Sequence, residues 1–172
     1  MKKKVSTQQL VTSIGILFWI FTVNVVALVL LPGVPAWPMF FITIFFFTLG
    51  ADTKNIASIF VSGLTGIVSA WALIKLLALL GPVMGEFPAM LLLLFLVLAL
   101  IIVGGNYFPL VFNNITFAYL TVAAIDLTIV ETTIVEWVAM HLLGGTIILV
   151  GALAISILVG KMLPSKYEQI DI

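Results

Sequence analysis

The chain has 172 residues, of which 63% are hydrophobic and 8% are charged, and its formal net charge is zero. Soluble domains carry about 25% charged residues, so the composition excludes an ordinary water-soluble domain and predicts an integral-membrane protein whose partner is the lipid bilayer. The seven basic residues are all lysines and form no basic stripe, which argues against nucleic-acid binding. The absence of cysteine excludes disulfides and thiolate chemistry.

Long apolar runs predict an all-α, polytopic membrane protein with six transmembrane helices, because about 20 apolar residues cross the bilayer core as a helix. The proline-rich stretch LPGVPAWP ends the first run, and Gly-Pro ends the third. The first run is expected to be a retained span, since no small-residue cleavage site closes it. We expect a single integral-membrane domain over residues 1–172, with spans at about residues 10–31, 37–50, 55–80, 88–103, 106–125 and 134–162.

Two of the six expected helices are short. Residues 37–50 and 88–103 reach only about 21–24 Å at 1.5 Å per residue, less than the ~30 Å bilayer core. Each is followed by a polar turn and a longer helix rich in small residues, which predicts a repeated helix-pair architecture and indicates a binding site or pathway. Alternatively, the short helices tilt less or thin the bilayer. Whether they cross fully or re-enter stays open.

The distribution of lysines predicts the orientation of the chain. Six crossings from a cytoplasmic N-terminus place both termini in the cytoplasm, and we expect the membrane to be a bacterial plasma (inner) membrane. The lysines on the inner side are then Lys2, Lys3, Lys4, Lys54, Lys161 and Lys166. The charged residues on the outer side are then Lys75, Glu86, Asp126, Glu131 and Glu136.

Three asparagines interrupt the apolar stretch VGGNYFPLVFNNITFAY. On the helix expected at residues 106–125, Asn106, Asn113 and Thr116 share one face, and Asn114 lies on the adjacent face. One interpretation is a carboxamide-lined pathway for a small-molecule solute, to which the amides offer both donors and acceptors. The alternative is hydrogen bonding between helices, because an amide in lipid must find a protein partner.

Other polar residues lie in or near the spans. Asn24 in the first span predicts a helix-packing contact, or a site for the solute. Lys75 is expected to extend its ammonium group to the interface; alternatively, it forms an ion pair on the outer side. The candidate partners of that ion pair are Asp126, Glu131 and Glu136.

His141 is the single histidine of the chain. It lies about 10 Å below the outer surface if the last span begins near residue 134. An imidazole titrates near neutral pH and can sense pH or relay protons; a structural hydrogen bond is the alternative. The sequence contains no catalytic motif and no set of metal ligands, so we expect no enzyme activity, no cofactor and no metal.

Glycines are concentrated on two of the expected helices. SGLTG, with Gly63 and Gly66, lies on the third, and a pair at 144–145 with Gly151 and Gly160 lies on the last. Small residues let helix backbones approach closely. We therefore expect tight packing at these surfaces, within a subunit or between subunits.

Three stretches resemble a bacterial family of small multispanning inner-membrane proteins that is catalogued as a domain of unknown function. They are SIGILFWIFTVNVVALVLLPGVPAWPMFFITIFFFTLGA, LTGIVSAW and FPLVFNNITFAY. Where members of that family tend to carry glycine, this chain has Asn114. The resemblance implies a multispanning bacterial membrane protein and no established activity.

The sequence therefore predicts a channel or facilitator for a small neutral or weakly polar solute. A homo-oligomer is expected, because six short helices make a narrow bundle. One alternative is a non-transporting membrane protein that serves in assembly. Another is a proton-coupled carrier, which needs a buried ionisable residue such as His141, Lys75 or Asp126.

Overall fold

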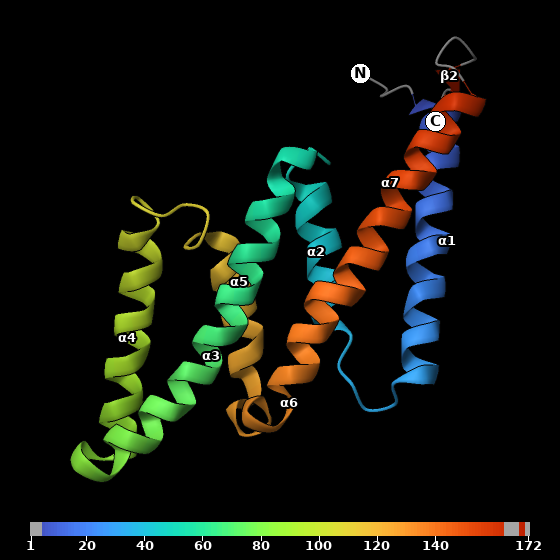
Figure 1. Cartoon of the computed structure of the whole chain (residues 1–172). Helices are drawn as coiled ribbons and strands as arrows, with labels where there is room; N and C mark the ends of the chain where they lie inside the picture. Colours follow the sequence, from blue (N-terminus) through green and yellow to red (C-terminus); the bar gives the residue numbers. More distant parts are fainter. Residues whose placement is uncertain (1–4, 164–168, 171–172) are drawn as a thin grey trace. The chain divides into compact units, whose positions relative to one another are not determined.

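The computed structural model describes residues 5–163 and 169–170, in which helices are joined by turns and loops and one pair of two-residue strands is present (Figure 1). The strands β1 (Val5–Ser6) and β2 (Gln169–Ile170) are antiparallel. The helices are α1 (Thr7–Leu30), α2 (Trp37–Thr48), α3 (Ile56–Met84), α4 (Glu86–Gly104), α5 (Asn114–Ala123), α6 (Leu127–Ala139) and α7 (Gly145–Met162). The π-helix Met140–Gly144 joins α6 to α7.

The expected all-α membrane fold with six helices, two of them short, is confirmed over the described residues. Four helical runs are long and apolar enough to cross a membrane: Thr7–Leu30, Thr53–Met84, Glu86–Gly104 and Leu127–Met162. The shorter apolar helices are α2 and α5. The lysines expected on the inner side at positions 2, 3, 4 and 166 lie outside the described residues.

Two predicted boundaries are wrong. The helix expected from residue 106 begins at Asn114, because residues 105–113 form turns and Asn113 caps the helix. The last helical run begins at Leu127 instead of 134. In its polar first turns, the hydroxyls of Thr132 and Thr133 donate to the carbonyl of Ile129 within the same helix, so these hydroxyls have partners inside the helix.

The short helices are also not the two that were expected. α4 has 19 residues, from Glu86 to Gly104, whereas α5 has only 10. The second helix pair is therefore long then short, which reverses the short-then-long order of α2 and α3. The predicted repeat of a short helix followed by a longer one does not hold for the second pair.

The chain divides into two compact units. The terminal unit comprises Met1–Gly33 and Thr146–Ile172, and the central unit comprises Val34–Gly145. Within the terminal unit, the indole nitrogen of Trp19 on α1 donates to the carbonyl of Ile148 on α7 at 3.1 Å. This long-range bond satisfies a polar group that lipid would leave without a partner.

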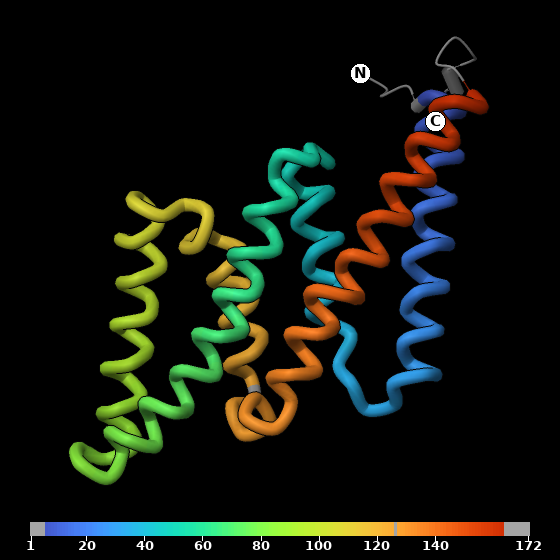
Figure 2. The backbone as a smooth tube through the Cα atoms, in the orientation of Figure 1, coloured from blue at the N-terminus to red at the C-terminus, as the bar shows by residue number. Residues whose placement is uncertain are grey.

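In the central unit, α3 packs against α2, α4, α5 and α6. Figure 2 shows α4 returning beside α3 after the turn between them. Gly85 allows that turn, because its φ of 89° is a backbone conformation that favours glycine. α3 thus takes part in most of the helix packing of this unit, including the packing at the candidate site.

Glycines provide close approach where the sequence predicted it. A Cβ atom at Gly66 would lie 2.5 Å from Tyr119 Cβ and 2.6 Å from the carbonyl oxygen of Thr116. A Cβ atom at Gly145 would lie 2.0 Å from Ile42 Cδ1 of α2. Because real Cβ atoms do not approach other atoms so closely, these helices pack at distances that only glycine permits.

Candidate functional site

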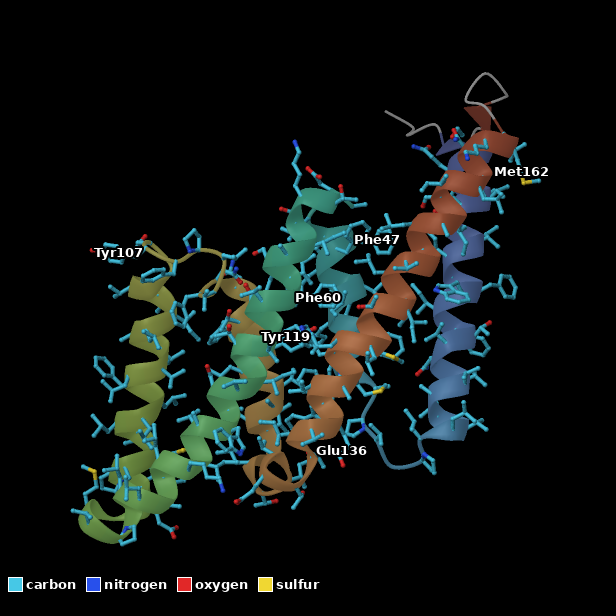
Figure 3. All side chains as sticks on the ribbon, in the orientation of Figure 1. Phe47, Phe60, Tyr107, Tyr119, Glu136 and Met162 are labelled. Atoms are coloured by element: carbon cyan, nitrogen blue, oxygen red, sulfur yellow. The ribbon has the colours of Figure 1, made fainter. Side chains whose placement is uncertain are left out.

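Tyr119 and His141 form a polar pair inside the central unit, and both side chains are fully buried. Tyr119 Oη lies 3.0 Å from His141 Nδ1, and it also donates to the carbonyl oxygen of Pro38 at 2.8 Å. The second ring nitrogen, Nε2, lies 2.9 Å from the carbonyl oxygen of Phe60. Figure 3 shows Tyr119 and Phe60 close together in the middle of this unit.

Four different elements bring this pair together. Pro38 belongs to α2, Phe60 to α3 and Tyr119 to α5, whereas His141 lies on the π-helix. A π-helix shifts the hydrogen-bond pattern of its turn, and such turns are frequent at functional sites. Gly63 completes the site, because a Cβ atom there would lie only 2.4 Å from His141 Cε1.

Aromatic rings pack against the ring of Tyr119, which is fully buried. The ring of Tyr119 lies 5.5 Å from that of Trp37 and 5.1 Å from that of Phe41. The ring of Trp37 in turn lies 5.2 Å from that of Trp137 in an edge-to-face arrangement. The polar pair therefore sits in apolar surroundings, where each hydrogen bond counts for more than in water.

A cavity of about 580 Å³ opens beside the N-terminus of α5. It carries three amides and one hydroxyl among apolar residues, and one of those amides, Asn114, is exposed. The residues that line the cavity are Leu49, Asn55, Ser58, Ile101, Ile102, Gly105, Pro109, Phe112, Asn113, Asn114 and Ile115. The structure thus brings two of the predicted asparagines, Asn113 and Asn114, to one hollow.

Asn113 has a structural role at this hollow. Its Oδ1 accepts from the backbone N–H of Ile115 at 2.8 Å, which caps α5. Its Nδ2 donates to Ser62 Oγ at 2.7 Å and to the carbonyl oxygen of Pro109 at 2.8 Å. Asn113 therefore ties the start of α5 to α3, which agrees with the interhelical interpretation of this residue.

A second, smaller hollow of about 230 Å³ lies near the C-terminus of α5. The residues that line it are Pro35, Trp37, Val122, Ala123, Ile125, Ile129 and Trp137. Ile115 in the first hollow and Ala123 in the second are separated by about 12 Å of helix. Tyr119 lies midway between them on the same face of α5, where it is fully buried.

The other asparagines lie elsewhere. Asn106 is exposed in the turn after α4, so the predicted helical face shared by Asn106, Asn113 and Thr116 is wrong. Thr116 is buried on α5, and its hydroxyl donates to the carbonyl of Val111. Asn24 is half-buried on α1 in the terminal unit. Only two of the four asparagines named as candidates therefore line the cavity.

Lys75 of α3 forms an ion pair with Glu131 of α6. Glu131 is one of the three carboxylates expected on its side of the membrane. The two side chains are 46% and 53% exposed, so the pair lies at the surface of the unit. Asp126, another of those carboxylates, belongs to a short 3₁₀-helix, and its side chain lies outside the described part of the structure.

Several residues of the site were not anticipated from the sequence. The sequence does not distinguish Tyr119, Ser58 and Ser62 from other residues of apolar helices. Only their contacts in the structure show their role. Among the described residues, no group of three or more His, Cys, Asp or Glu side chains is placed to hold a metal ion. The chemistry available at the site is therefore hydrogen bonding by amides, hydroxyls and one imidazole.

The apolar helices, the amide-lined cavity and the buried polar pair define an all-α, polytopic membrane protein. The chain belongs to the family described as "Protein of unknown function (DUF1097)", whose family model matches residues 11–163. This match confirms the resemblance to a family of unknown function. Neither the curated proteins nor the solved structures contain a significant match to the chain.

Proposed function

We propose that this protein is a channel or facilitator for a small neutral or weakly polar solute in a bacterial plasma membrane. The observation that carries the proposal is the cavity of about 580 Å³ in which Asn55, Ser58, Asn113 and Asn114 meet. Polar groups among apolar membrane helices cost free energy unless they have hydrogen-bond partners, and a bound solute or water can supply such partners. Amides and hydroxyls suit an uncharged solute, because they offer both donors and acceptors.

The arrangement of the two hollows supports a pathway along α5. One hollow contains Asn114 at the start of this helix, and the other contains Ala123 at its end. Tyr119 lies between them on α5 and contacts His141, and both side chains are fully buried, so the described structure is closed at Tyr119. Passage of a solute would require these two side chains to separate, as in transport proteins that open alternately to the two sides.

The proposal includes the orientation with both termini in the cytoplasm. Within the central unit, Lys54 precedes the start of α3, and Glu86 follows the end of this helix. From the positive-inside rule we expect the start of α3, and with it the cavity near Asn55, on the cytoplasmic side. We also expect a homo-oligomer, because a small helical bundle encloses a pore poorly, and no catalytic activity.

The experiment that tests the proposal is solute flux into proteoliposomes, measured by stopped-flow light scattering with urea and glycerol as probes. The wild-type protein is compared with Asn114→Leu, which replaces the exposed amide of the cavity wall by an apolar side chain without removing the Asn113 cap. Asn106→Leu is the matched control, because Asn106 is exposed outside the cavity. We expect Asn114→Leu to lower the flux at least fivefold, and Asn106→Leu to leave it unchanged.

Two results would contradict the proposal. One is a wild-type flux no higher than that of empty liposomes for every uncharged probe. The other is an Asn114→Leu flux equal to that of the wild type. Equal expression and equal thermal stability of the two asparagine variants are required, so that a lost flux reflects the cavity and not the fold.

A proton-coupled carrier is the second candidate function, and the full burial of His141 beside Tyr119 favours it. Coupled transport would make uptake depend on an imposed pH gradient, and His141→Gln would abolish that dependence. A facilitator would show the same flux with and without the gradient. The same proteoliposomes therefore distinguish the two mechanisms.

A further inference from the structure

Three polar contacts run in series through the buried pair, with a backbone carbonyl at each end. The series is Pro38 carbonyl, Tyr119 hydroxyl, His141 Nδ1, His141 Nε2 and Phe60 carbonyl, with contact distances of 2.8, 3.0 and 2.9 Å. All three distances are those of hydrogen bonds. Each contact therefore needs one hydrogen, and a carbonyl oxygen can supply none.

The number of hydrogens depends on the protonation state of His141. A tyrosine hydroxyl supplies one hydrogen and a neutral imidazole supplies one, which makes two hydrogens for three contacts. Whichever tautomer forms, one contact then brings two lone pairs together. An imidazolium supplies two hydrogens, so with Tyr119 it completes all three contacts.

We propose that Tyr119 and His141 form a proton-binding site, in which uptake of one proton by the imidazole completes the series between the carbonyls of Pro38 and Phe60. This inference stands apart from the proposed transport, because proton binding is measurable without any solute. The ring would donate from Nε2 to Phe60 and from Nδ1 to Tyr119, while Tyr119 donates to Pro38. Hydrogen bonds from a charged donor are about twice as strong as neutral ones.

The described hydrogen-bond partners of the imidazole are the oxygens of Tyr119 and Phe60. α2 contains no titratable residue, and α5 contains only Tyr119. The single charged residue of α3 is Lys75, which is paired with Glu131 of α6 at the surface. The remaining carboxylate of α6, Glu136, lies five residues before His141. No described carboxylate forms an ion pair with the imidazole, so oxygen dipoles must offset the burial of the charge.

Proton binding at this site would fasten four elements of the central unit. The completed series joins α2 through Pro38, α5 through Tyr119, and α3 through Phe60 to the π-helix that carries His141. Loss of the proton removes one of these bonds and loosens one of the connections. α5, which contributes lining residues to both hollows, is thus one of the elements that the proton holds in place.

The test is a pH titration of the full chain in lipid nanodiscs with ¹⁵N-labelled histidine. His141 is the single histidine, so the two ring nitrogens report this site alone. We expect the ring to become an imidazolium as the pH falls from about 8 to about 4. Tyr119→Phe removes the oxygen that accepts from Nδ1, and should lower the midpoint by about one pH unit or more.

Tyr107→Phe is the matched control, because it makes the same chemical change at a residue that is 75% exposed in the turn after α4. It should titrate as the wild type does. An imidazole that stays neutral over the whole range overturns the inference, and so does a Tyr119→Phe midpoint equal to that of the wild type. If Tyr119→Phe does not fold, the wild-type spectrum decides. Two slowly exchanging ring N–H signals at acidic pH support the site, and a single one overturns it.

Discussion

Gly63 of α3 lies directly against His141: a Cβ atom at residue 63 would be 2.4 Å from His141 Cε1 and 2.8 Å from Tyr119 Cζ. Both side chains are fully buried, so neither has free space into which to move. The position of the imidazole therefore depends on the absence of a side chain on a helix that is distant in sequence. The packing of the site is testable through this glycine.

We expect Gly63→Ala to lower the free energy of unfolding by about 1–3 kcal/mol, because overpacking a filled core forces neighbouring atoms to shift. The measurement is thermal unfolding in detergent micelles. Gly81→Ala on the same helix is the control, since a Cβ atom there would lie 3.5 Å from Glu86 Cγ, an ordinary contact. Equal stability of the two variants would show that α3 is not packed against His141 as described.

Asn113 and Asn114 are neighbours with different roles, and their alanine variants should differ accordingly. Asn113→Ala removes the cap of α5 and the bond to Ser62, and should destabilise the protein by about 1–2 kcal/mol. Asn114→Ala removes an exposed amide and should change stability by less than about 0.5 kcal/mol. Thermal unfolding of the two variants in the same detergent checks this. The reverse order of stability would contradict the assigned capping role.

The positions of the helices were largely predictable, because each long apolar run ends at a conformational stop. Pro32 and Gly33 follow α1, and Gly85 follows α3. The start of the fifth helix was not predictable from polarity alone. Asn106 and Asn113 both suit a cap, and the choice of Asn113 depends on Ser58 and Ser62, which only the fold brings close.

The buried pair could be predicted only in part. His141 stood out as the single histidine, but its contact with Tyr119 joins residues 22 positions apart, and its contact with Phe60 joins residues 81 apart. His141 also lies in a π-helix, where the 3.6-residue periodicity of a regular α-helix no longer applies. Long-range packing thus determined the part of the site that local sequence patterns do not encode.

The ion pair between Lys75 and Glu131 tests the packing of α3 against α6. Lys75→Glu places two carboxylates together and should lower the melting temperature, whereas Lys75→Glu combined with Glu131→Lys should restore it. Because both side chains are about half exposed, the coupling energy from the double-mutant cycle should be below about 1 kcal/mol. The control is Lys54→Glu with Glu131→Lys, since Lys54 precedes the start of α3. A swap at Lys75 that restores no more than this control would contradict the pairing.

In the terminal unit, Gly151 of α7 faces the indole of Trp19 on α1. A Cβ atom at residue 151 would lie 2.1 Å from both Trp19 Nε1 and Cε2. The rigid ring cannot bend away, so Gly151→Ala should displace it and break its 3.1 Å hydrogen bond to the carbonyl of Ile148. We expect a loss of about 1–3 kcal/mol of stability, measured by thermal unfolding in detergent.

Gly160 on the same helix provides the control for this prediction, because a Cβ atom there would meet only Gln8 Nε2, at 3.5 Å. Gly160→Ala should therefore unfold at the wild-type temperature. Trp19→Phe in the Gly151→Ala background removes the larger ring and should recover part of the loss, since the smaller ring leaves room for the new methyl group. Additive losses in the double variant would mean that Gly151 and Trp19 are not in contact, because only residues that touch or share partners depart from additivity.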